Sequence, residues 1–207
     1  SVSGFNNAGF GLMNNNLMSF VLDPVINLTI AALIILGGLG YPVLIAIHAG
    51  MRKSLFHRND EAQKQLTEDV KGVVASSVQT KVAIMGTILL LVFGTVFLLM
   101  IDSTNPLIKD YNIYQKLMIS FFQSVSTRNA GFNTIDIGAL HVSTLFVFII
   151  LMVIGANPAG TAGGIKIPTI AVLYGYIKDW FKAPGQAVIL FDKKINLQAR
   201  AIRVILR

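Results

Sequence analysis

The sequence predicts an all-α membrane protein built from helix–pore-loop–helix repeats, and three observations lead to this prediction. Only 13% of the residues are charged and 54% are hydrophobic, whereas about a quarter of the residues in a soluble domain are charged. Residues 24–51, 82–101 and 137–165 each lack Asp, Glu, Lys and Arg, and about 20 apolar residues cross a bilayer. A nearly identical phrase also occurs twice, each time shortly before one of these uncharged stretches.

The repeated phrase reads Ser-Val-Ser, a short variable stretch and then Asn-Ala-Gly-Phe. It occupies residues 1–10 and, one residue shorter, residues 124–132. This repetition indicates copies of one unit, in which a short re-entrant element precedes a membrane helix. We expect the end of one unit, one complete unit and the approach to a third. Because the chain does not begin with Met, we expect a fragment or a processed piece.

The placement of charges predicts the orientation in the membrane. The net charge of +7 could suggest a nucleic-acid partner, but the basic residues gather in residues 51–81 and 166–207, which flank the apolar stretches. Residues 1–24 have no basic residue, and residues 102–140 are balanced. The positive-inside rule therefore places the two basic segments in the cytoplasm and both repeated phrases on the outer side. We expect a lipid bilayer, and no nucleic acid, as the partner of this chain.

The order of elements follows from the apolar and polar stretches. We expect a membrane helix at residues 24–51 running inward, in which Gly37, Gly38 and Gly40 allow close helix packing. A cytoplasmic helix and loop at 54–80 leads to an outward-running helix at 82–101. Residues 111–126 cover roughly 24 Å as a helix and suit a half-membrane helix. Residues 137–182 form a broken span, and the basic residues 191–207 form a helix that approaches another span.

The repeated phrase has the composition of an ion-selective loop. Backbone carbonyls replace the water shell of the cation in potassium channels, and non-helical backbone at membrane depth is tolerated where it is buried or lines a water-filled cavity. Glycine allows positive φ, alanine is small, and phenylalanine can wedge the loop against helices. The half-helix before the second copy would aim the negative end of its dipole at a cation. The predicted filter residues are Asn7, Ala8, Gly9, Phe10, Asn129, Ala130, Gly131 and Phe132.

An extracellular turn is the alternative for this phrase, since Asn and Gly are ordinary turn residues. Its doubling at matched positions favours a pore loop. Arg128 stands next to the second copy, and we expect it to point away from the ion path and bond to carbonyls or to a carboxylate such as Asp136. Asp23, Asp102 and Asp136 are expected on the outer side, where they raise the local cation concentration or form solvated helix ends.

A second informative segment interrupts the stretch from residue 137 to residue 182. Its glycines and proline disfavour a continuous helix by on the order of 7 kcal/mol. We expect a mobile loop near the bilayer midplane, and broken spans of this kind line ion paths. A simple packing kink is the alternative, whereas a nucleotide-binding loop lacks its Lys-Ser/Thr pair. The predicted gating loop comprises Gly155, Ala156, Asn157, Pro158, Ala159, Gly160, Thr161, Ala162, Gly163 and Gly164.

No arrangement of residues predicts an enzyme or a covalently bound cofactor. His48, His57 and His141 lie far apart and lack metal-ligand spacing, and the chain has no cysteine for a disulfide or a thiolate metal site. No clustered triad or carboxylate pair is present in the sequence. The predicted metal is the transported ion itself, bound at the filter carbonyls.

At the repeated phrase and the Gly-rich segment, the chain resembles the Ktr, Trk and HKT superfamily of potassium transporters, and most closely the Ktr membrane subunit. This resemblance implies four helix–pore-loop–helix repeats in the complete protein. Residues 1–53 then correspond to the end of the second repeat, 54–81 to a cytoplasmic connection and 82–182 to the third repeat. Residues 183–207 correspond to a cytoplasmic linker and the start of the fourth. Residues 155–164 would plug the pore below the filter.

The resemblance also implies function and partners. It implies potassium uptake across the bacterial plasma membrane through a single-glycine filter, with sodium as a stimulating ion. The implied partners are a second copy of the membrane subunit and a cytoplasmic nucleotide-binding ring like that of Ktr systems, which alone would carry nucleotide. A sodium or ammonium transporter of the same architecture and a non-transporting membrane scaffold for a cytoplasmic partner are the alternatives. Two quarters of a filter cannot conduct by themselves, so the remaining repeats are expected outside this sequence.

Overall fold

The computed structural model describes residues 1–55, 77–180, 188–190 and 193–195. Within these residues the fold is helical apart from one short hairpin. The elements are α1 (Val2–Phe5), η1 (Met18–Phe20), α2 (Pro24–Leu39), α3 (Tyr41–Leu55), α5 (Ser77–Asp102), α6 (Ile113–Ser126), η2 (Ile137–Ala139), α7 (Val142–Val153), α8 (Ile167–Trp180), β1 (Val188–Leu190) and β2 (Lys193–Ile195).

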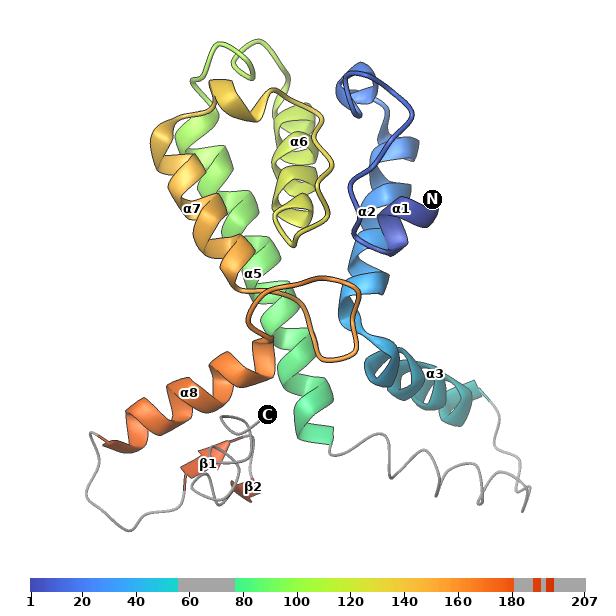
Figure 1. Cartoon of the computed structure of the whole chain (residues 1–207), viewed down its shortest axis with the longest axis vertical. Helices are drawn as coiled ribbons and strands as arrows, with labels where there is room; N and C mark the ends of the chain where they lie inside the picture. Colours follow the sequence, from blue (N-terminus) through green and yellow to red (C-terminus); the bar gives the residue numbers. More distant parts are fainter. Residues whose placement is uncertain (56–76, 181–187, 191–192, 196–207) are drawn as a thin grey trace.

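The long helix α5 is the axis around which the other helices are arranged (Figure 1). Helices α6 and α7 pack against its upper half, and α2 packs against α6 from the other side. Helices α3 and α8 diverge at the lower end, where α5 begins. The two basic segments therefore start from the same end of the molecule, as the positive-inside rule predicts.

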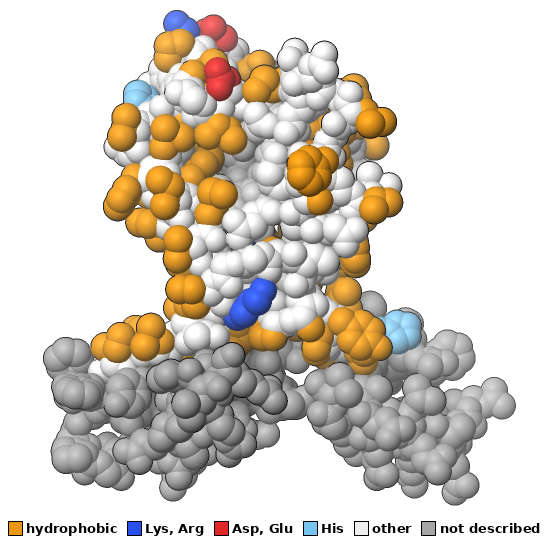
Figure 2. Space-filling view, viewed as in Figure 1, with side chains coloured by type: hydrophobic (Ala, Val, Ile, Leu, Met, Phe, Trp, Pro, Cys, Tyr) orange, Lys and Arg blue, Asp and Glu red, His pale blue; other side chains and the backbone are white. Residues whose placement is uncertain are grey.

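Helix α5 is the one described helix long and apolar enough to cross a membrane, over Thr80–Asp102, and α2 with α3 forms a second span if the bent pair is counted as one. Large hydrophobic side chains such as Leu89, Phe93 and Phe146 are exposed. Figure 2 shows hydrophobic side chains spread over the sides of the body and acidic side chains at its upper edge. Such an apolar belt suits contact with lipid acyl chains.

The expected single helix over 24–51 is wrong, because the chain bends by 102° between α2 and α3. Gly40 separates the two helices with φ +81° and ψ 152°, a conformation open to glycine. Pro42 then lies in the first turn of α3, where its missing N–H costs no helical hydrogen bond. Of the glycines predicted to pack against another helix, Gly37 lies against Phe5 at the end of the short helix α1, whereas Gly38 and Gly40 face the segment that follows α7.

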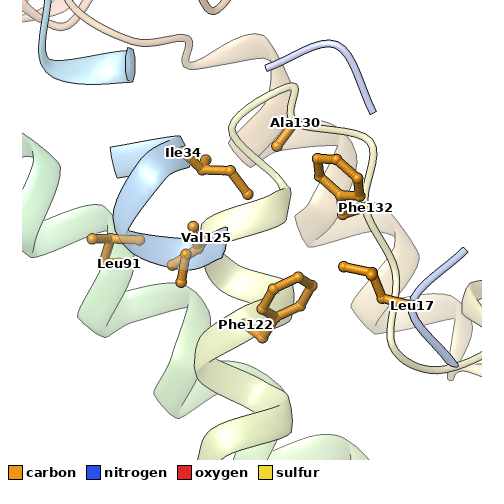
Figure 3. Packing of buried hydrophobic residues seen from close by; sticks show 8 residues of the cluster. Leu17, Ile34, Leu91, Phe122, Val125, Ala130 and Phe132 are labelled. Atoms are coloured by element: carbon orange, nitrogen blue, oxygen red, sulfur yellow. The ribbon is translucent and has the colours of Figure 1, made fainter. Parts of the chain in front are cut away.

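The bounds of helix α6, Ile113–Ser126, agree closely with those of the half-membrane helix predicted at 111–126. The backbone N–H of Asn112 donates to Oε1 of Gln115 at 3.0 Å, which fixes the start of the helix. The C-terminal half of α6 is buried and joins a core shared with α2 and α5. Figure 3 shows this core beside the end of α6, formed by Leu17, Ala31, Ile34, Leu91, Phe122, Val125, Ala130 and Phe132.

Asp102 is not a solvated helix end, which corrects one of the sequence expectations. Its side chain is fully buried, and its Oδ1 accepts hydrogen bonds from Asn105 Nδ2 at 3.1 Å and from the backbone N–H of His141 at 3.2 Å. Its Oδ2 accepts one from the hydroxyl of Thr144. The carboxylate thus ties the end of α5 to the start of α7. Asp23 and Asp136 do cap helix starts, through Val25 and Gly138 N–H groups.

We predict that Asp102→Ala lowers the free energy of unfolding by about 3 kcal/mol, because it leaves buried donors without their acceptor. Thermal unfolding of the purified protein in detergent measures the change. Asp110→Ala is the matched control, since Asp110 is exposed in the same connection between α5 and α6. Equal melting temperatures for the two variants would contradict a structural role for Asp102.

The C-terminal part differs from the expected helix at 191–207. Residues Lys193–Ile195 form a strand that pairs antiparallel with Val188–Leu190. Val188, Ile189 and Ile195 are β-branched residues, which favour strands. Residues 196–207, and the expected cytoplasmic helix and loop between 56 and 76, lie outside the described residues. The division of the chain into four parts stays a prediction.

Candidate functional site

The two copies of the repeated phrase share positive φ at the same asparagine and the same glycine. Gly9 and Gly131 have φ values of +72° and +74°, so the prediction of positive φ at both glycines is confirmed. Asn7 and Asn129 also have positive φ, at +51° and +63°. Asparagine is among the few side-chain-bearing residues that accept this conformation readily. Each phrase therefore forms a tight non-helical turn with the same pattern.

The two turns contact each other backbone to backbone at their glycines. A Cβ built on Gly9 would lie 2.7 Å from the carbonyl O of Ala130 and 2.8 Å from Cα of Gly131. A Cβ built on Gly131 would lie 3.0 Å from Cα of Gly9. Any side chain at either position would push the turns apart. The fold thus joins the two segments that the sequence reasoning selected.

The second phrase is held by the end of α6. The N–H of Ala130 donates to the carbonyl of Ser126 at 3.1 Å, and the hydroxyl of Ser126 donates to the carbonyl of Phe132. Phe132 is buried in the core beside α6 (Figure 3), as expected of a wedge. The same expectation is wrong for Phe10, whose side chain is 82% exposed. The short α1 before it offers no surface comparable to that of α6.

Arg128 points away from the two glycine turns. Its side chain is 6% exposed, and one guanidinium N–H donates to the backbone carbonyl of Thr87 on α5 at 2.8 Å. The expected bond to a carbonyl is thus confirmed, while the alternative partner Asp136 instead caps η2. The arginine fixes the second turn to the middle of α5.

The Gly-rich segment forms a compact loop between α7 and α8, so the predicted break is confirmed. Its two ends pair as a parallel bridge between Ile154 and Ile165. A Cβ on Gly155 would lie 1.7 Å from the carbonyl O of Gly163, so only glycine allows this closure. Lys166 Nζ donates to the carbonyl of Ala162 at 2.7 Å, which adds a hydrogen bond within the C-terminal part of the loop.

The loop lies against the repeated phrases. The hydroxyl of Thr161 donates to the carbonyl of Phe5 at 2.9 Å and accepts a hydrogen bond from Asn7 Nδ2 at 3.0 Å. On the other side, Asn129 Nδ2 donates to the carbonyl of Met152 at 3.2 Å, in the last turn of α7. The second phrase is thus fixed to the helix that precedes the loop. Figure 1 shows the loop crossing below α6 towards α2.

Apart from the Lys166 ammonium, which donates to Ala162 within the loop, and the buried Arg128 guanidinium, which donates to Thr87, the polar groups gathered here are neutral oxygens and amides. Within the residues that the structure describes, no group of His, Cys, Asp or Glu could hold a metal ion. His48 and His141 are exposed, and His57 lies outside the described residues. Neutral carbonyl oxygens are the ligands that potassium channels use to replace the hydration shell of their ion. The arrangement is therefore suited to contact a partly dehydrated cation.

A family model described as "TrkH: Cation transport protein" matches residues 1–197. The chain belongs to this family. TrkH-family proteins are membrane cation transporters and not enzymes, so the chain is a multi-pass protein of the cell membrane. The resemblance drawn from the repeated phrase and the Gly-rich segment is confirmed at the level of the family.

Among curated relatives, the chain is 35% identical over 198 residues to "Ktr system potassium uptake protein B" of Vibrio alginolyticus, covering 95% of this chain and 39% of that protein. It is 31% identical over 205 residues to "Potassium/sodium uptake protein NtpJ" of Enterococcus hirae, covering 99% of this chain and 41% of that protein. The crystal structure of the potassium transporter TrkH from Vibrio parahaemolyticus matches 99% of this chain and 40% of its own, with a TM-score of 0.69 and 17% identity. The TrkH fold is thus shared, and the chain spans about two fifths of its relatives' length.

Sequence reasoning missed two residues of this TrkH-family site. Asn16 Nδ2 donates to the carbonyl of Gly131 at 3.2 Å, and Thr87 bonds both Arg128 and, through its hydroxyl at 3.4 Å, Asn157 Nδ2. Asn16 has a positive φ of 53°, and its place in a run of three asparagines was the one available signal. Thr87 carried no signal, because it is one small polar residue in an apolar helix.

Proposed function

We propose that this chain supplies two of the four walls of a potassium-selective filter and the gate beneath it. The observation that carries the proposal is the backbone contact between Gly9 and Gly131, two positive-φ glycines from duplicated turns. Two matching turns side by side suit neighbouring walls of a ring of carbonyls like the one that replaces the hydration shell of potassium in channels. The carbonyl ligands are those of Asn7, Ala8 and Gly9 and of Asn129, Ala130 and Gly131.

Potassium is the proposed ion because of the ligand chemistry and the names of the relatives. Carbonyl oxygens carry no net charge, and they replace the hydration shell of potassium in channels. Helix α6 ends at Ser126, next to the second turn, so the negative end of its dipole favours a cation there. One relative is named a potassium uptake protein and another a potassium/sodium uptake protein. We therefore propose potassium as the transported ion and sodium as a stimulating or second ion.

Competition for Rb⁺ uptake by the full-length protein in liposomes tests this proposal. We expect K⁺ to inhibit Rb⁺ uptake at lower concentration than Na⁺ or NH₄⁺, because the filter selects by ligand number and geometry. Stronger inhibition by Na⁺ or NH₄⁺ would instead identify a sodium or ammonium transporter. No uptake from a correctly inserted protein would favour a membrane scaffold.

The cytoplasmic end supports a proposed partner. The two basic segments begin at the end of the molecule where α3 and α8 diverge (Figure 1). We propose that this end binds a nucleotide-binding regulatory ring and that the membrane subunit acts as a homodimer. Nucleotide would bind only to that ring. Co-purification of the full-length protein with such a ring, and its mass in detergent, test both statements.

A further inference from the structure

The last turn of α2 has carbonyl groups that its own helix cannot satisfy. A helix leaves its final four carbonyls without donors, and α2 ends at Leu39 because the chain turns at Gly40. The loop after α7 supplies two of the missing donors. The N–H of Asn157 donates to the carbonyl of Gly38 at 3.1 Å, and the N–H of Thr161 donates to the carbonyl of Gly37 at 3.1 Å.

The contact is reciprocal, since α3 also bonds to the loop. The N–H of Tyr41, at the start of α3, donates to the carbonyl of Ala159 at 3.4 Å. Three backbone hydrogen bonds thus join the broken helix of one repeat to the loop of the next. We call Gly37, Gly38, Gly40 and Tyr41 the seat.

The glycines of the seat make this close approach possible. A Cβ on Gly40 would lie 2.5 Å from the carbonyl O of Pro158, and its nearest neighbours all belong to the loop. A Cβ on Gly160, from the loop side, would lie 2.7 Å from the carbonyl O of Gly38. A Cβ on Gly38, in contrast, would meet Ala156 Cβ at an ordinary 3.5 Å. Backbone packs against backbone with no side chain between.

Bonds within the loop differ from the bonds between loop and seat. The bridge of Ile154 with Ile165 and the bond from Lys166 to Ala162 are internal, so the loop can leave the seat and keep its own shape. The bonds to the seat, those of Thr161 to Phe5 and Asn7, and the bond from Asn157 Nδ2 to Thr87 on α5 must break when it leaves. The two bonds of Thr161 connect the loop to the first repeated phrase.

We infer that the broken end of α2 is the seat on which the loop closes, so that the gate of one repeat is held shut by its neighbour. This inference rests on the proposed function of the loop as a gate. Opening exchanges the three seat bonds for bonds to water. The α2–α3 break is then a part of the gate and not only a bend in a membrane helix.

Gly40→Ala and Gly11→Ala are a pair that tests the seat. Alanine at 40 collides with the loop and is strained by the φ of +81°, so it should unseat the loop and raise Rb⁺ flux by about tenfold, which corresponds to the loss of one or two backbone hydrogen bonds. Alanine at 11, outside the seat, meets nothing nearer than the backbone N of Met13 at 3.9 Å and should leave flux near that of the wild type. The preference for K⁺ over Na⁺ should be unchanged in both, since neither substitution alters Gly9 or Gly131. Equal flux for the two variants in normally inserted protein would overturn the inference.

A second pair covers the case in which Gly40→Ala fails to insert. Thr161→Val removes the hydroxyl that bonds to Phe5 and Asn7, whereas Thr161→Ser keeps it. We expect about fivefold higher flux for valine and wild-type flux for serine. The same flux for both would overturn the contribution of Thr161 to closure.

A pair of introduced cysteines detects the contact between the loop and the seat independently of transport. The chain has no cysteine, so Tyr41→Cys with Ala159→Cys introduces a single possible crosslink across the seat. We expect oxidation to form it, detected by mass, and to abolish flux until a reductant is added. Tyr41→Cys with Ser143→Cys, at the far end of α7, should not crosslink.

The outcomes of the crosslinking experiment distinguish a failure of the seat inference from a failure of the proposed function. A crosslink that leaves flux unchanged, or no crosslink at all, would overturn the seat as a gate contact. A crosslink in a protein that never transports a cation would support the contact but overturn the proposed function, and the gate with it.

Discussion

Gly131→Ser in the full-length protein is expected to lower the preference for K⁺ over Na⁺ by about tenfold, or about 1.4 kcal/mol. Gly131 has φ +74°, and a Cβ there would lie 3.0 Å from Cα of Gly9. A side chain with this φ costs about 1–2 kcal/mol, and the contact with backbone forces the two turns apart. A wider, less regular set of carbonyls discriminates less well between ions of different size.

The measurement is the ratio of K⁺ and Na⁺ concentrations that halve Rb⁺ uptake in liposomes. Gly11→Ser is the matched control, because a Cβ on Gly11 has nothing nearer than the backbone N of Met13 at 3.9 Å. Gly9→Ser should be more severe than Gly131→Ser, since its Cβ would meet the carbonyl O of Ala130 at 2.7 Å. An unchanged ratio in Gly131→Ser would contradict the filter assignment.

The glycine turns were predictable from the sequence because their cause is local. Gly9 and Gly131 adopt positive φ within their own phrases, and the duplication revealed both at once. The break after Val153 was likewise predictable, since four glycines and a proline lie close together in residues 154–166. Local backbone preference is enough to decide such features.

Features set by distant contacts were not predictable. The break at Gly40 did have a local signal, because Gly40 and Pro42 both disfavour a continuous helix, but its bonding partner, the loop at residues 157–161, lies far away in the sequence. Asp102 ends an apolar helix and suggested solvent exposure, but the connection to α7 folds over it. Phe10 and Phe132 occupy the same place in the phrase and differ in burial, because only the second lies beside α6.

Deletion of residues 155–164 is expected to raise Rb⁺ flux by up to about 100-fold. The three backbone bonds between loop and seat are each worth about 1 kcal/mol, and about 3 kcal/mol of lost closure corresponds to that factor. The deletion should spare the surrounding helices. The backbone N of Ile165 lies 2.9 Å from the carbonyl O of Val153, so the cut ends already lie close together.

A loop of the same length built from Gly and Ser separates bulk from the native conformation of the loop. It keeps the backbone groups that bond to the seat but loses Pro158 and the side-chain bonds of Asn157 and Thr161. If closure needs the native conformation, the Gly/Ser loop should give flux close to that of the deletion; if the loop acts by filling space, flux should stay near the wild type. Unchanged flux in a normally inserted deletion protein would exclude the loop as a gate. Because the deletion leaves Gly9 and Gly131 in contact, it should change flux with little change in selectivity, whereas Gly131→Ser should change selectivity. Opposite responses of this kind would separate the filter from the gate within one chain.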